Sequence, residues 1–115
     1  MHVEVNDEVR GMRCAYKRMA KILKRINDPR QPWKVWHNLV EILMICILGI
    51  TAGADSSYKI YLFAINRKAW LRKYMTLEHG IPGRLTIERV LAAIDPRAME
   101  RAFVLIMKSQ PFQNY

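Results

Sequence analysis

Features that support catalysis are scarce in this sequence of 115 residues. The one glycine-rich turn, GIPG at residues 80–83, lacks the following Lys-Ser/Thr of a phosphate-binding loop and follows no strand pattern. Histidine occurs three times, and none of His2, His37 and His79 belongs to a metal-ligand pattern. The carboxylates are scattered, without a pair suited to acid–base chemistry. We therefore expect a protein that is not an enzyme and that uses no cofactor, metal or small-molecule substrate.

Cysteine and long hydrophobic runs are also scarce. Cys14 and Cys46 are the only cysteines, and both lie in apolar helical patterns, so we interpret them as small buried hydrophobes in a reducing compartment. The longest apolar run, residues 39–54, is interrupted by Glu41 and is shorter than the roughly 20 residues that span a bilayer. Three acidic residues occupy the place of a basic signal-peptide region: Glu4, Asp7 and Glu8. These features predict a soluble cytoplasmic protein without a membrane partner.

Positive charge is the feature in excess. The chain has 19 Lys plus Arg against 10 Asp plus Glu, a formal net charge of +9. Such an excess in a short chain indicates a polyanionic partner, with nucleic acid ahead of an anionic membrane. The alternative is that the basic side chains only keep the protein in solution.

Hydrophobic residues make up 51% of the chain and recur at helical spacing, which predicts one all-α domain, a small bundle of about five to six helices. A first helix is expected at residues 7–26, capped by Asn6 or Asp7 and stopped by Asp28-Pro29. A second helix begins near His37 or Asn38, with Asn38 as its expected cap, and is buried on most sides. His37 is interpreted as a packed or capping residue. The first helix has one apolar stripe: Val9, Met12, Tyr16, Met19, Leu23 and Ile26.

Three further helical segments follow. Residues 56–75 form one long helix or two pieces jointed near Asn66, capped by Asp55 or Ser56. A short helix is expected at residues 85–94, and Asp95-Pro96 opens the last helix, which ends by Ser109 and Pro111. The predicted apolar faces are Tyr58, Leu62, Ile65 and Ala69 in the first segment, Ile87, Val90, Leu91 and Ile94 in the second, and Ala98, Ala102, Leu105 and Ile106 in the third.

Basic residues concentrate in three places. The first helix carries a basic stripe, which can face phosphate, an acidic protein or a membrane surface, or be a solvated face only. Within residues 59–73, Trp70 is interpreted as core, not as a base-stacking residue. The turn before residue 84 is either the corner of a helix-turn-helix or an ordinary corner of a bundle. The candidate nucleic-acid ligands are Arg67, Lys68, Arg72 and Lys73 for phosphates, and Arg84, Thr86 and Arg89 for base edges.

Several segments in order resemble one family, the N-terminal DDE-transposase-associated domain of bacterial insertion-sequence transposases of the H-repeat (ISAs) type. The resemblance covers about residues 26–107 and departs at Gly83-Arg84-Leu85, where the family tends to have Ser-His-Asp before the threonine. The motifs that carry it are Asp28-Pro29-Arg30, His37 with Leu39 and Leu43, Gly53-Ala54-Asp55-Ser56, Trp70-Leu71, Gly80-Ile81-Pro82 with Thr86, and Asp95-Pro96.

The resemblance implies a helical domain that precedes a catalytic domain of RNase H-like fold and helps to bind the DNA ends of the element. No residue of this chain matches a catalytic or metal-binding position of that family. We accordingly divide the chain into a basic amphipathic helix and link at residues 1–30, the associated domain at residues 31–110 and a frayed tail at residues 111–115.

Three hypotheses follow for function. The first is a non-catalytic DNA-binding domain, or a truncated remnant, of an insertion-sequence transposase. The second is a helical interaction module that dimerises or modulates a transposase. The apolar stripe of the first helix and the expected exposure of Trp33 and Trp36 favour this hypothesis. The third is a decayed reading frame without a selected function.

Overall fold

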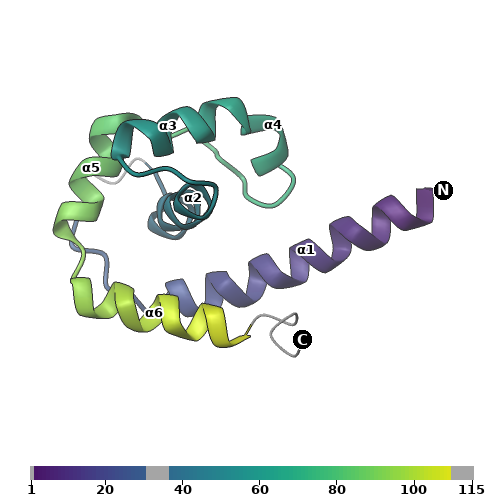
Figure 1. Ribbon diagram of the computed structural model, residues 1–115, viewed down its shortest axis with the longest axis horizontal. Helices are drawn as coiled ribbons and strands as arrows, with labels where there is room; N and C mark the ends of the chain where they lie inside the picture. Colours follow the sequence, from purple (N-terminus) through teal and green to yellow (C-terminus); the bar gives the residue numbers. More distant parts are fainter. Residues whose placement is uncertain (1, 31–36, 110–115) are drawn as a thin grey trace.

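The computed structural model describes residues 2–30 and 37–109, and the regular structure in these ranges is helical throughout. In Figure 1, α2 lies at the centre, with α3 and α4 on one side, α1 and α6 on the other, and α5 joining the two sides. This arrangement confirms the predicted all-α bundle. The six helices within the described residues are α1 (His2–Leu23), α2 (Leu39–Thr51), α3 (Ser57–Asn66), α4 (Lys68–Leu71), α5 (Arg84–Ala93) and α6 (Pro96–Ser109).

Helix α2 forms the core of the bundle. Every residue from 42 to 47 is buried, because the helix is apolar around its whole circumference and can only be accommodated at the centre. Asn38 caps its start, accepting the N–H of Glu41 at its Oδ1 atom at 3.3 Å. After the last turn, Gly53 takes a φ of +106°, a conformation that glycine adopts without steric cost. The predicted buried central helix and its cap are confirmed.

Helix α3 packs with a different face from the one the sequence predicts. Its buried residues are Ile60 and Ala64, while Tyr58, Leu62 and Ile65 are 51%, 37% and 43% exposed. The segment is apolar at almost every position from residue 60 to 65, so its periodicity fits more than one face. Packing against α2 determines which face of α3 is buried, because Gly49 of α2 has no side chain and lets Ile60 approach closely. The predicted stripe through Tyr58, Leu62, Ile65 and Ala69 is therefore wrong.

Two of the alternatives for residues 56–75 are now decided. The segment forms two pieces, because α3 ends at Asn66 and Arg67 has a non-helical ψ of 18° before α4 begins. Ser56, not Asp55, caps α3 by accepting the N–H of Lys59 at 3.2 Å. Asp55 instead forms an exposed ion pair with the Lys59 ammonium at 3.1 Å.

Helix α1 differs from its predicted limits at both ends. It begins at His2, so the expected caps Asn6 and Asp7 lie inside the helix. It ends at Leu23 and continues as a turn to Ile26, before Asp28-Pro29 is reached. Asp28 is instead held by Arg30, whose guanidinium donates to it at 2.8 Å.

From residue 11 onward, where the side chains of α1 are described, its apolar stripe is buried only toward the C-terminal end; the Val9 side chain lies outside this range. Leu23 and Ile26 are buried, Tyr16 and Met19 are half-buried, and Met12 is exposed. Cys46 is buried as predicted, but Cys14 is exposed, so the prediction of two buried cysteines is wrong for Cys14. The reason is that the bundle covers α1 only on the side facing α2 and α6, and its first turns extend beyond the other helices (Figure 1).

The last two helices follow the sequence closely. Ile87, Val90 and Ile94 are buried and Leu91 is half-buried, as predicted. Asp95 caps α6 by accepting the N–H of Arg97 at 3.0 Å, and Pro96 is its first residue.

The predicted apolar face of α6 is correct except at one position. Ala102 and Ile106 are buried and Ala98 is half-buried, but Leu105 is exposed, because residues 102–107 form an unbroken apolar run and only one side of it meets α1. Among the described helices none is both long and apolar enough to cross a membrane. Trp33, Trp36 and the tail at residues 111–115 lie outside the described residues.

Candidate nucleic-acid interface

Four cations predicted to contact phosphate cluster around α4. All four, Arg67, Lys68, Arg72 and Lys73, are exposed, and none forms an ion pair within the described part of the chain. Leu71 is fully buried and fixes the short helix to the core, so the flanking cations are directed away from it. The Arg67 guanidinium lies 5.8 Å from the centre of the Phe63 ring, which restrains it at the end of α3.

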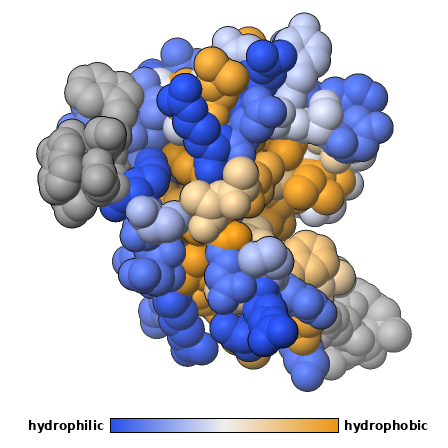
Figure 2. Space-filling model, turned by 90° about the vertical axis from the view of Figure 1, so that its left-hand side faces the viewer, coloured by the Kyte–Doolittle hydropathy of each residue, from blue (hydrophilic) through white to orange (hydrophobic). Residues whose placement is uncertain are grey.

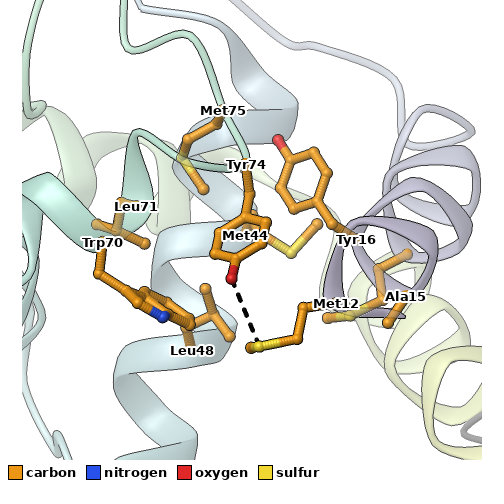
Figure 3. A pocket seen from close by; sticks show the side chains of 10 residues that line it. Met12, Ala15, Tyr16, Met44, Leu48, Trp70, Leu71, Tyr74 and Met75 are labelled. Atoms are coloured by element: carbon orange, nitrogen blue, oxygen red, sulfur yellow. Dashed lines mark hydrogen bonds between the residues drawn. The ribbon is translucent and has the colours of Figure 1, made fainter. Parts of the chain in front are cut away.

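A small apolar cavity ties the α4 region to α1 and α2. It has a volume of about 100 Å³, and Figure 3 shows Trp70 and Leu71 facing Met12 and Tyr16 across it. The Tyr74 hydroxyl donates to the Met12 sulfur at 3.5 Å, and the Trp70 and Tyr74 rings meet edge to face at 5.2 Å. Trp70 packs against the core. Its predicted role as a core residue is confirmed.

Glu41 holds the segment that follows α4, a role that the sequence did not reveal. Its Oε2 atom accepts the Thr76 N–H at 3.0 Å, the Thr76 hydroxyl at 2.9 Å and the Leu77 N–H at 3.4 Å. Leu77 has a φ of +46°, which costs a non-glycine residue energy, so these bonds help to maintain a strained turn. The only sequence signal was a single carboxylate in an otherwise apolar helix.

The turn into α5 explains the Gly80-Ile81-Pro82 motif. The Gly80 N–H donates to the Leu77 carbonyl at 2.9 Å, and Gly80 has a φ of +79°, which favours glycine at this position. Pro82 is fully buried beside the core. Residues 72–83 separate α4 from α5, whereas a helix-turn-helix joins its helices by a turn of about three or four residues. The structure therefore favours the ordinary corner of a bundle over the helix-turn-helix.

The second set of predicted ligands lies in the N-terminal half of α5 and just beyond it. Arg84 and Arg89 are exposed and Thr86 is half-buried, while Ile87 and Val90 on the opposite side are buried. Figure 1 places α4 and α5 at opposite ends of α3, a helix about 15 Å long. The structure thus brings the residues of each set together but keeps the two sets apart.

An apolar groove lies at the α5 end of the molecule. Its volume is about 400 Å³, and Figure 2 shows hydrophobic atoms across the middle of this face, between hydrophilic surfaces above and below. Ile50 and Phe103, which line the groove, are 52% and 41% exposed. A groove of this kind is suited to another protein more than to a phosphate backbone.

Two histidines far apart in the sequence meet beside the start of α2. The His37 and His79 rings lie edge to face with their centres 6.4 Å apart. Burial, followed by repulsion from His79 and Arg30, lowers the pKa of His37. His37 is therefore the packed residue of the two alternatives, since Asn38 provides the cap. Among the described residues no group of three or more His, Cys, Asp or Glu side chains could hold a metal ion.

The described residues thus form a small helical domain on which the cations around α4 and in α5 are exposed. The chain belongs to the DDE_Tnp_1-associated family, which matches residues 20–106. The family places this sequence with transposase-associated domains, in agreement with the resemblance found from its motifs. No solved structure matches the chain.

Its relatives include several Escherichia coli proteins whose names describe them as putative or inactive transposases. "Putative transposase YncI" of strain O157:H7 is 42% identical over 69% of this chain and 20% of its own length. "H repeat-associated putative transposase YhhI" of strain K12 is 34% identical over 80% of this chain and 24% of its own. The chain therefore spans about a fifth to a quarter of these two proteins. "Inactive transposase YbfQ" of K12 is 35% identical over 64% of this chain and 92% of its own length.

Proposed function

We propose that this transposase-associated domain binds duplex DNA through its phosphate backbone and takes no part in bond breaking or joining. The observation that carries the proposal is the cluster of four exposed cations around α4, free of ion pairs within the described part of the chain. Cations without carboxylate partners lose no ion pair when they bind phosphate. The net charge of +9 acts in the same direction, because it attracts DNA over the whole surface.

In this proposal the cations of α4 supply affinity. Each neutralised phosphate releases counterions and adds about 0.9 to the slope of log affinity against log salt. Four contacts by Arg67, Lys68, Arg72 and Lys73 therefore correspond to a slope contribution of about 3.6.

Arg84, Thr86 and Arg89 are proposed to contact base edges, as the sequence predicts. Arg84 and Arg89 are exposed, and arginine can bind guanine through two hydrogen bonds in the major groove. Since α5 lies at the other end of α3, its contacts would be made separately from those of α4. Charge reversal in R84E/R89E should then weaken binding, and unchanged affinity would contradict a role for this helix.

The test is a salt-titrated binding assay with two duplexes of equal length. One carries the terminal repeats of a neighbouring insertion element, and the other has a random sequence. The protein should bind both, with a preference for the repeats if α5 contacts bases. R67Q/K68Q/R72Q/K73Q should lose most of the affinity for both duplexes and lower the slope by about 3.6. Absence of duplex binding by the unchanged protein at 50 mM salt would refute the proposal.

A second candidate function is a protein-interaction module that dimerises or modulates a transposase. The apolar groove with exposed Ile50 and Phe103 favours it. A stable dimer in a size measurement, together with no affinity for duplex DNA, would support this function over DNA binding.

A further inference from the structure

A row of lysines on α1 borders the segment that follows α4. A groove of about 360 Å³ runs between α1 and residues 74–76, and Lys17, Lys21 and Lys24 line its α1 side. Tyr74 and Thr76 line the opposite side. Arg72 and Lys73 do not line the groove, but they directly precede Tyr74, so the groove joins the lysines to the end of the α4 cluster about 50 residues further along the chain.

The spacing of the three lysines fits a phosphate backbone. They are separated by four and three residues, and the Lys24 N–H still donates to the Ala20 carbonyl at 2.9 Å just after the end of α1, so the three lie on one face over about 10.5 Å. One strand of duplex DNA carries a phosphate for about every 3.4 Å of helix axis, hence about three phosphates over this length. One lysine is thus available for each phosphate.

The charge of the groove is positive. Glu41 is the only carboxylate among the residues that line it, and its Oε2 atom is already occupied by Thr76 and Leu77. The three lysines are exposed and form no ion pair within the described ranges. Lysines paired with carboxylates would point to an internal salt-bridge network, whereas this row leaves its charge available to an external anion.

We propose that Lys17 and Lys21 of α1, together with Lys24 in the turn directly after it, continue the cluster at Arg72 and Lys73 as a single track for one DNA strand. The inference rests on the proposed function and extends it, because it adds α1 to the interface and orients the duplex along that helix. Lys17 precedes residue 20, where the family match begins, so the track begins outside the segment shared with the family.

An anionic membrane is the other surface that a basic helix can bind. A helix lying in a membrane interface needs a free apolar face to insert. Beside the three lysines the apolar face of α1 packs against α2 and α6, with Leu23 buried and Tyr16 and Met19 half-buried. The structure therefore favours DNA, and vesicle binding becomes an outcome of the test.

The experiment compares two triple variants of the full chain in the salt-titrated assay with random duplex. K17Q/K21Q/K24Q should lower the salt slope by about 2.7, so that its loss of affinity between 50 and 200 mM salt is about 40-fold smaller than that of the unchanged protein. The control R97Q/R101Q/K108Q removes the same charge from exposed residues of α6 and should change the slope by less than about 1. K17R/K21R/K24R keeps the charges and should retain the original slope.

The outcomes separate this inference from the proposed function. If the unchanged protein binds duplex and the two glutamine variants have equal slopes, the track along α1 is refuted while DNA binding stands. If the unchanged protein fails to bind duplex, both are refuted. If the unchanged protein binds vesicles with anionic lipid through the same lysines but does not bind duplex, membrane binding replaces both the proposed function and the track along α1. Unfolding midpoints of all variants establish that lost affinity does not reflect lost folding.

Discussion

Replacing Glu41 by alanine tests how the segment after α4 is held in place. The substitution removes the acceptor of three hydrogen bonds, of which the two to Thr76 are short, at 2.9 and 3.0 Å, and the one to the Leu77 N–H is long, at 3.4 Å. A hydrogen bond to a charged group contributes about 1.5–3 kcal/mol when it is buried. Thr76 is exposed, so we assign about 1 kcal/mol to each short bond and none to the long one.

Relief of backbone strain offsets part of this loss. Leu77 is held in a left-handed conformation that costs about 1 kcal/mol, and a released segment can recover some of that energy. The free energy of unfolding should therefore fall by about 1–2 kcal/mol in Glu41→Ala, which lowers the melting temperature by about 4–8 °C in a domain of this size. Urea and thermal unfolding followed by circular dichroism measure both quantities.

Two further variants make the result specific. Glu41→Gln keeps a neutral oxygen acceptor and should lose about half as much stability as Glu41→Ala. Glu88→Ala removes an exposed carboxylate of α5 that forms no ion pair in the described part of the chain, and should change stability by less than about 0.5 kcal/mol. Equal stabilities for Glu41→Ala and Glu88→Ala would refute the reasoning.

Three other predictions follow from burial. Ile60→Ala should lower the free energy of unfolding by about 2–4 kcal/mol, because Ile60 is buried, whereas Leu62→Ala should lower it by less than about 1 kcal/mol. Urea titrations measure both changes, and similar losses would contradict the observed face of α3. Cys14 should react with a thiol reagent in the folded protein, whereas burial raises the pKa of Cys46 to about 12 and should delay its labelling until unfolding, with peptide mass spectrometry giving the order. His37 has a lowered pKa in the folded state, so the unfolded chain binds its proton more readily and stability should fall as the pH drops below about 6.5; a His37→Gln variant with an unchanged pH dependence would exclude His37 as the cause.

The two proposed DNA-binding surfaces differ in what they can contribute. The α4 cluster and the α1 lysines offer point charges that bind any sequence, whereas Arg84 and Arg89 of α5 are arginines that can discriminate bases. A domain built in this way would hold DNA mainly by charge. R84E/R89E would then lose the sequence preference as well as part of the affinity, while most of the salt slope follows the lysines and arginines of the α1–α4 side.

Local signals in the sequence were sufficient for several elements. The apolar sequence from residue 42 to 47 determined that α2 is the central helix, because side chains without polar groups on any side can only be buried. Asn38 and Asp95-Pro96 determined where α2 and α6 begin, since a cap bonds N–H groups only two or three residues away. The alternation of Ile87, Val90 and Ile94 with charged residues determined the buried face of α5.

Other features depended on contacts between distant parts of the chain, and only the tertiary structure decided them. The face of α3 was ambiguous in an apolar segment, and its approach to α2 at Gly49 selected Ile60 over Leu62. Glu41 accepts hydrogen bonds from residues 35 and 36 positions further along the chain. Lys17, Lys21 and Lys24 line one groove together with the segment after α4. Periodicity determines which residues share a face of one helix, but not which of two apolar faces another helix will cover, nor which separate charges will lie side by side.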